Sequence, residues 1–352
     1  MTRTAVLICP GRGTYNKPEL GYLHRHHADK AGLFAGFDAA RAAAGQEEVT
    51  ALDGATRFSV SKYSRGDIAS PLIYASALAD AQSLADDIEV VAVTGNSMGW
   101  YIALAVAGAL SAQDGFELVN TMGTLMQEHL IGGQLVYPFT GDDWRPDAAR
   151  KAELLALVDQ INARESHRLA LSIDLGGMLV LAGDEAGLTA FESVVPQIED
   201  RFPMRLANHA GFHTHLQEPV AAEGRDRLDG AMLTQPAVPL VDGRGAIWQP
   251  ESSDLASLWD YTLGHQVVES YDFTRAVQVA AQEFAPDLFI VTGPGTTLGG
   301  AVAQSLVHQD WRGMSDKAGF KLRQASSPVL ISMGDAVQRS LVTTENRSAK
   351  TG

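Results

Sequence analysis

Residues 89–110 read EVVAVTGNSMGWYIALAVAGAL, an apolar run followed by a Gly-x-Ser-x-Gly motif and then by a segment rich in alanine and leucine. This order predicts a buried strand, a sharp turn and a helix, with the hydroxyl of Ser97 exposed at the end of a sheet. The backbone N–H of Met98, at the start of that helix, would be free to bind an oxyanion. The pentapeptide alone also fits an ordinary tight turn, but its flanking strand and helix favour a nucleophilic serine.

The composition indicates a globular protein of one large domain or two modest ones, with 352 residues, 45% hydrophobic and 20% charged. A net charge of −15 argues against a nucleic-acid partner. Cys9 is the single cysteine, so no internal disulfide forms, and this fits a reducing compartment. The N-terminus lacks a signal-peptide pattern, and no apolar run approaches about 20 residues. We therefore expect a cytoplasmic protein without a membrane partner.

A second glycine-rich turn follows the predicted strand at residues 4–9, in the sequence Pro10-Gly11-Arg12-Gly13. Such a turn places backbone N–H groups at the carboxyl edge of a sheet. It therefore fits a second oxyanion donor, a phosphate cradle or an ordinary strand-to-helix turn. Neither a following Lys-Ser/Thr nor a third glycine is present, so nucleotide binding is not favoured. Further along, Ser70-Pro71 predicts the start of a helix over residues 70–86, with Ser70 as its cap.

The segment from residue 131 to 208 has a different pattern of expected strands and helices, and this pattern predicts a small inserted subdomain. Its expected elements follow the order β-α-β-β-α-β of the split ferredoxin-like pattern. They are strand 134–139, helix 147–164, strand 168–174, strand 177–182, helix 185–200 and strand 203–208. The larger α/β body is then formed by residues 1–130 and 209–310, with a strand at 288–291, and a further strand is expected at 329–332, beyond this body.

These motifs together resemble the malonyl-CoA:acyl-carrier-protein transacylases and the acyltransferase domains of polyketide synthases. The matching segments occur in the family's order over residues 1–308 and are Pro10-Gly11-x-Gly13, Ser70-Pro71, Gly95–Gly99, residues 107–111, residues 122–127, Phe212-His213-Thr214, Gln266 and Gly293-Pro294-Gly295. The resemblance implies an α/β-hydrolase-like large subdomain with an inserted ferredoxin-like small subdomain. Residues 311–352 have no counterpart and are expected to form a C-terminal extension with a disordered tail.

The resemblance also implies ping-pong transfer of an acyl group from coenzyme A to the phosphopantetheine thiol of an acyl carrier protein, in fatty acid or polyketide biosynthesis. By motif position Ser97 is acylated, His213 is its general base and acid, and Gln266 lies where a carbonyl orients the histidine. The oxyanion hole would use the N–H groups of Met98 and Arg12. Acyl-CoA and phosphopantetheine are substrates, so no cofactor is expected.

A metal site is the competing interpretation of His209, His213 and His215, which form an H-x-x-x-H-x-H pattern. No carboxylate or cysteine set completes such a site, and Gly211 makes a continuous strand doubtful. We therefore expect no metal, and surface or packing roles for His209 and His215.

The chain departs from the family at four substrate-facing positions. Asn96 replaces a histidine, Arg12 a glutamine, Trp100 a glutamate, and Met122 the arginine that clamps the malonyl carboxylate. Asn96, Trp100, Met122 and Phe212 are the expected substrate-binding residues. Because a thioether cannot neutralise a carboxylate, Met122 predicts a neutral acyl group such as acetyl. Arg12 could instead supply the cation from the opposite wall, which would restore selectivity for malonyl.

Two other functions remain open. The same residues would serve a thioester hydrolase if water reached the acyl-enzyme, and the substitutions also fit a non-catalytic docking homologue. A carrier protein of this class is acidic, so a transferase needs a basic patch. The candidates are Arg201, Arg205, Arg225 and Arg227.

Overall fold

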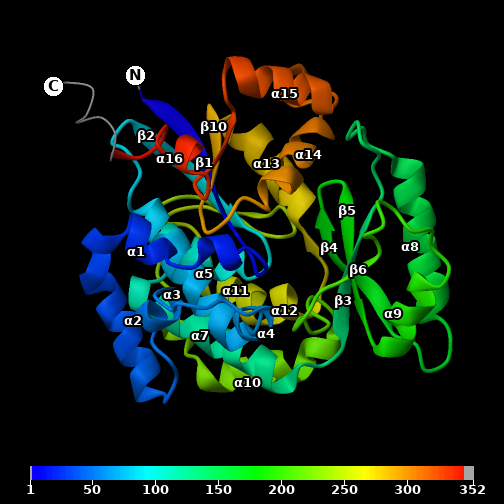
Figure 1. Cartoon of the computed structure of the whole chain (residues 1–352), viewed down its shortest axis with the longest axis horizontal. Coiled ribbons are helices and arrows are strands. Elements are labelled where there is room, and N and C mark those ends of the chain that lie inside the picture. The colour runs from blue at the N-terminus through cyan, green and yellow to red at the C-terminus, as the bar shows by residue number, and fades with distance from the viewer. Residues whose placement is uncertain (1, 345–352) are drawn as a thin grey trace.

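The computed structural model describes residues 2–344, which form a large α/β body and a smaller lobe (Figure 1). The sheet of the body has the strand order β11-β10-β1-β2-β7-β8. Neighbouring strands are parallel except for β8, which is antiparallel to β7. The strands are β1 (Arg3–Cys9), β2 (Ile88–Gly95), β7 (Leu240–Val241), β8 (Ile247–Trp248), β10 (Leu288–Val291) and β11 (Leu330–Ser332).

The central strands of this sheet are continuous apolar runs because helices cover the faces of the sheet and bury them. The helices before the lobe are α1 (Tyr22–His26), α2 (Ala31–Ala43), α3 (Val49–Asp53), α4 (Val60–Tyr63), α5 (Gly66–Ala81), α6 (Gly99–Val106) and α7 (Ala112–His129). Those after it are α10 (Glu218–Arg227), α11 (Leu255–Asp260), α12 (Gln266–Val268), α13 (Phe273–Phe284), α14 (Gly299–Val307), α15 (Lys317–Ser326) and α16 (Ala336–Arg339). None of the helices within residues 2–344 combines the length and apolarity needed to span a bilayer.

The smaller lobe, drawn in green in Figure 1, contains a second sheet of order β6-β3-β5-β4-β9. Its elements follow the predicted β-α-β-β-α-β order: β3 (Gly133–Pro138), α8 (Ala148–Asn162), β4 (Leu169–Leu175), β5 (Met178–Gly183), α9 (Glu185–Glu192) and β6 (Met204–Arg205). Strand β9 (Tyr271–Asp272) comes from the body and pairs in parallel with β4. The two parts of the molecule are therefore joined by backbone hydrogen bonds as well as by the chain.

Helix α5 begins earlier than predicted, at Gly66, so Ser70 is not its cap and Pro71 lies inside the helix. A proline in this position cannot donate to the carbonyl four residues before it, which is that of Asp67. The buried guanidinium of Arg41 compensates for this loss, because its Nη1 donates to the Asp67 carbonyl at 2.9 Å. This contact from α2 thus allows a proline inside a helix, at a position where the local sequence predicts that the helix begins.

Residues 311–344 are packed into the body, so the prediction that they form an extension is wrong. Strand β11 pairs with β10, because Leu330 and Ile331 are apolar and buried in the main core. Two further predicted lengths are also wrong: α9 ends at Glu192 rather than at 200, and β6 has two residues. The expected disordered tail lies in residues 345–352, outside the described residues.

Candidate active site

Ser97 lies on the sharp turn between β2 and α6, with a backbone φ of +57°. Both glycines of the motif are required by packing rather than by flexibility. A Cβ on Gly95 would overlap the backbone of Gly99, and a Cβ on Gly99 would overlap the carbonyl of Cys9. Strand, turn and helix therefore approach one another as closely as a nucleophile elbow demands.

His213 reaches this serine from a loop that follows the small lobe. Its Nε2 lies 2.7 Å from the Oγ of Ser97, and its Nδ1 lies 2.6 Å from the backbone carbonyl oxygen of Gln266. Because a carbonyl can only accept, Nδ1 carries the proton, and Nε2 is left with a lone pair toward the serine hydroxyl. The ring is thus held in the tautomer that accepts a proton from Ser97.

The pKa of His213 is lowered from its ordinary value of 6.5 to about 4. Burial is the main cause and nearby His265 adds to it, whereas the Gln266 carbonyl acts in the opposite direction. No carboxylate within residues 2–344 contacts the His213 ring. The imidazole is therefore neutral at pH 7 and available as a base.

Side chains from three further positions hold the dyad. The Nε2 of Gln266 donates to the carbonyl of Ser97 at 3.0 Å, and its Oε1 accepts from the hydroxyl of Tyr101 at 3.0 Å. The hydroxyl of Tyr271 donates to the carbonyl of Gly95 at 2.6 Å, and its ring lies beside that of His213. Gln266 was expected here, but the two tyrosines were missed because no motif marks them.

A small, mostly apolar cavity adjoins the Ser97 hydroxyl. Its lining residues are Arg12, Ser70, Ser97, Met98, Tyr101, Met122, Gly123, Met126, Phe212, His213, Gln266 and Val267. Of the expected substrate-binding residues, Met122 and Phe212 are present. Ser70, predicted as a helix cap, is present too, and its buried hydroxyl has no hydrogen-bond partner within the described chain.

Arg12 points its guanidinium into this region. Its Nη2 donates to the carbonyls of Ser64 at 2.5 Å and Asn208 at 2.8 Å, and the group lies 5.4 Å from the centre of the Phe212 ring. Its Nε and Nη1 are buried without a partner among residues 2–344. Burial lowers the pKa of Arg12 to about 10, with the charge of Asp67 opposing, so the group stays protonated at neutral pH.

The two backbone N–H groups expected in the oxyanion hole lie on the loops that flank Ser97. Met98 directly precedes α6, and Arg12 follows β1, whose Cys9 pairs in register with Gly95 of β2. Across the described part of the chain, neither N–H donates to a protein acceptor. Unused donors beside a nucleophile are the arrangement that oxyanion stabilisation requires.

Two expected substrate-binding residues lie elsewhere. Trp100 is completely buried and donates from Nε1 to the hydroxyl of Thr262 at 3.0 Å, because α6 turns this position toward the core. Asn96 lines a second cavity, between the body and the small lobe, together with Arg12 and Arg201. Asn96 therefore does not line the acyl cavity, and its expected role in substrate binding stays a prediction.

His215 and the arginines of the predicted basic patch do not line the acyl cavity. His215 is exposed and pairs with Glu218 and Glu269. No group of three or more potential metal ligands occurs in residues 2–344. In the predicted basic patch, three arginines are ion-paired with carboxylates: Arg205, Arg225 and Arg227. Arg201 instead packs over the Phe202 ring and lines the second cavity.

The fold and this site define an α/β protein with a serine–histidine pair on a nucleophile elbow, and solved structures share its architecture. A malonyl-CoA:acyl carrier protein transacylase from Xanthomonas oryzae superposes with a TM-score of 0.72 at 19% identity, covering 97% of this chain and 98% of that one. A malonyl-transacylase in complex with a type II polyketide synthase acyl carrier protein gives 0.72 at 18% identity, covering 98% and 100%. The predicted fold class is confirmed.

The sequence relatives are malonyl transacylases and polyketide synthases, so the predicted resemblance is also confirmed. A malonyl CoA-acyl carrier protein transacylase of Bacillus subtilis is 26% identical over 210 residues, which are 59% of this chain and 62% of that protein. A polyketide synthase of Streptomyces halstedii is 27% identical over 231 residues, 65% of this chain and 4% of that protein. The chain thus spans less than two thirds of these two relatives. No protein-family model matches it.

Proposed function

We propose that this protein transfers acyl groups between thiols through an acyl-serine at Ser97. The observation that carries the proposal is the 2.7 Å contact between Ser97 Oγ and the neutral Nε2 of His213. His213 takes the hydroxyl proton as Oγ attacks the thioester carbonyl, and the N–H groups of Met98 and Arg12 stabilise the oxyanion. The intermediate collapses, the C–S bond breaks, and the departing thiolate takes the proton from His213.

The second half-reaction repeats these steps with another thiol. We infer coenzyme A as the donor carrier and the phosphopantetheine arm of an acyl carrier protein as the acceptor, because the relatives are named for these groups. The second cavity, which shares Arg12 with the acyl cavity, offers an approach for a long flexible arm between body and lobe. An imidazole of His213 that is uncharged at pH 7 suits both half-reactions, because in each it accepts one proton and then returns it.

Two residues of the acyl cavity favour different acyl groups. Met122 is buried in the wall, and a thioether favours a neutral group such as acetyl. Arg12 favours the other group: two of its buried nitrogens have no partner within the described chain, and such a cation favours an acyl group that carries a carboxylate, such as malonyl. The neutral group is the primary proposal and malonyl transfer through Arg12 the second candidate.

Mass spectrometry of the intact protein after mixing with acetyl-CoA and malonyl-CoA tests both. An acetyl adduct on Ser97 supports the first candidate, and a malonyl adduct that disappears in Arg12→Gln supports the second. A malonyl adduct that persists in Arg12→Gln would mean that this guanidinium does not bind the acyl group.

Hydrolysis of the acyl-enzyme is the competing reaction, since the same groups would activate water. It is measured as release of free acid in the absence of an acceptor thiol, and a rate equal to that of transfer would favour a thioesterase. The non-catalytic alternative is tested with a fluorophosphonate probe. Complete inertness of Ser97 toward this probe would support a docking role.

A further inference from the structure

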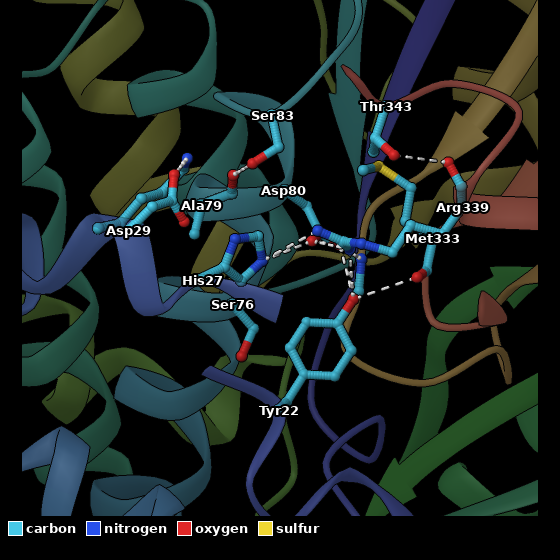
Figure 2. Close-up of polar contacts among 12 residues, drawn as sticks. Tyr22, His27, Asp29, Ser76, Ala79, Asp80, Ser83, Met333, Arg339 and Thr343 are labelled. Atoms are coloured by element: carbon cyan, nitrogen blue, oxygen red, sulfur yellow. Dashed lines mark hydrogen bonds and ion pairs between the residues drawn. The ribbon is translucent and has the colours of Figure 1, made fainter. Parts of the chain in front are cut away.

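A second cluster of buried polar groups lies outside the active site, around the carboxylate of Asp80 in α5 (Figure 2). This carboxylate has no exposed surface. It accepts hydrogen bonds from the Tyr22 hydroxyl at 2.8 Å and from the backbone N–H of Gly293 at 2.6 Å, and the His27 Nε2 lies 2.8 Å from it. Arg339, which is 3% exposed, completes the set as an ion pair.

The charges of this cluster balance internally. Burial alone would raise the pKa of Asp80, but the hydrogen bond from His27 and the charge of Arg339 outweigh it, so the pKa lies below its ordinary value. Asp80 is therefore an anion matched by the Arg339 cation. The group joins four segments of the chain that are far apart in sequence: α1, α5, the loop after β10, and the C-terminal segment (residues 330–343).

The loop after β10 connects this cluster to the active site. A Cβ on Gly295 would lie 2.5 Å from the carbonyl oxygen of Thr14, so this loop touches the loop that carries Arg12. The hydroxyl of Thr14 in turn donates to the carbonyl of Gly11 at 3.2 Å. On the other side, Gly334 packs so tightly against Gly295 that no side chain fits there. Residues 293–295 are thus held between the C-terminal segment and residues 11–14.

We propose that Asp80 and Arg339 are positioning residues that fix the loop after β10 and, through it, the backbone N–H of Arg12 in the oxyanion hole. Asp80 binds the backbone N–H of Gly293 in this loop directly, and Arg339 forms an ion pair with Asp80. The C-terminal segment, which had no counterpart in the sequence resemblance, is then part of the support of the active site. The inference rests on the proposed function, because it takes the Arg12 N–H as an oxyanion donor.

The test compares Arg339→Gln with Arg41→Gln. Arg41 is a matched control because it is 1% exposed and donates to Glu47, Asp67 and Asn120, none of which lines the acyl cavity. The readout is the rate at which a fluorophosphonate probe labels Ser97, well below each variant's melting temperature. We expect both variants to have a lower melting temperature than the wild type. Only in Arg339→Gln should the probe label Ser97 about tenfold more slowly, because small displacements of catalytic groups reduce rates by factors of this order or more.

Further measurements make the result specific. The pH at which labelling falls should be unchanged in Arg339→Gln, because His213 is not touched, and Arg339→Lys should recover part of the rate. If Arg339→Gln does not fold, Tyr22→Phe removes one hydrogen bond to Asp80 and should slow labelling by a smaller factor. The proposal would be overturned if Arg339→Gln and Arg41→Gln were labelled at equal rates. If Arg339→Gln does not fold, equal labelling rates for Tyr22→Phe and the wild type would overturn it.

The probe also separates this inference from the proposed function. A wild-type protein that reacts with the probe but transfers no acyl group would contradict the proposed function and leave the labelling comparison valid. A wild-type Ser97 that does not react would overturn both.

Discussion

His213 and His27 are both buried histidines that lie in hydrogen-bonded clusters, but the partners of their rings differ. His213 bonds to a backbone carbonyl and to the hydroxyl of Ser97, with no anion in contact. His27 bonds to the carboxylate of Asp80, which is itself paired with Arg339. His213 lines the cavity beside Ser97, whereas His27 lines a separate cavity formed with residues of α1 and α2.

This difference shows how burial serves catalysis in one place and stability in another. Beside Ser97, several polar groups have no partner among residues 2–344: two nitrogens of Arg12, the hydroxyl of Ser70 and two backbone N–H groups. Around Asp80, four donors from the chain itself satisfy the carboxylate, and among the described residues the Nδ1 of His27 is a buried atom of this cluster without a partner. Unsatisfied buried groups are costly unless a ligand completes them, so their concentration near Ser97 marks the site that binds one.

The largest expected effect is that of Ser97→Ala. The acyl adduct should disappear and transfer should fall by about 10³-fold or more, because the nucleophile is lost. The melting temperature should change little, since the hydrogen bond to His213 is the one that the Ser97 hydroxyl makes within residues 2–344. Transfer rates and thermal melts monitor the two quantities. Substantial transfer by the variant would show that another residue carries the acyl group.

In the polar cluster around Asp80, the largest expected effect is the loss of stability in Asp80→Asn. Removing the anion breaks the buried ion pair with Arg339, which costs about 3–5 kcal/mol in the free energy of unfolding. Denaturant titration measures this loss. The control is the double variant Asp80→Asn/Arg339→Gln, which should lose less than the sum of the single variants because the residues share one ion pair. Additive losses would argue against the pair.

The pH dependence of Ser97 labelling should reflect the lowered pKa of His213. The rate should be constant from about pH 5 to 8 and fall below pH 4, about tenfold per pH unit, as the imidazole becomes protonated. Since the folded-state pKa lies below the ordinary 6.5, protonation favours unfolding, and this histidine's contribution to stability decreases as the pH falls from 6.5 toward 4. A rate that already falls near pH 6.5 would indicate a solvated ring.

The smallest expected effect concerns acyl selectivity. Met122→Arg should raise malonyl loading relative to acetyl by about tenfold, because a guanidinium in the wall can pair with the carboxylate. Met126→Arg is the matched control, one turn further along α7 in the same cavity. Competition between the two thioesters, followed by mass spectrometry, gives the ratio. An unchanged ratio would mean that position 122 does not face the acyl group.

Much of the fold was predictable because it depends on local patterns. Apolar runs marked most strands of both sheets, although the two-residue strands β8 and β9 were not predicted, and the order of elements from residue 131 to 208 revealed the small lobe. The errors arose where distant contacts override local rules. Pro71 lies inside α5 because Arg41 satisfies the freed carbonyl, and the C-terminal segment belongs to the body because β11 completes the sheet.

The residues of the site likewise fall into those that the sequence predicted and those that it did not. The elbow at Ser97 follows from the spacing of two glycines, and His213 and Gln266 followed from a resemblance in motif order. Trp100 was misplaced because a helix can turn any position toward the core. Tyr101, Tyr271 and Ser70 were missed, since their roles depend on partners that the chain brings together only when folded.

The sequence by itself determined the backbone of the reactive turn, because only glycine fits where strand and helix approach so closely. It also determined the order of strands and helices, through apolar periodicity. Only the tertiary structure decided the pKa of His213, the unpaired nitrogens of Arg12 and the pairing of Asp80 with Arg339, which are 259 residues apart. The reason is that burial and charge depend on which distant groups surround an atom, and that is a property of the packed chain.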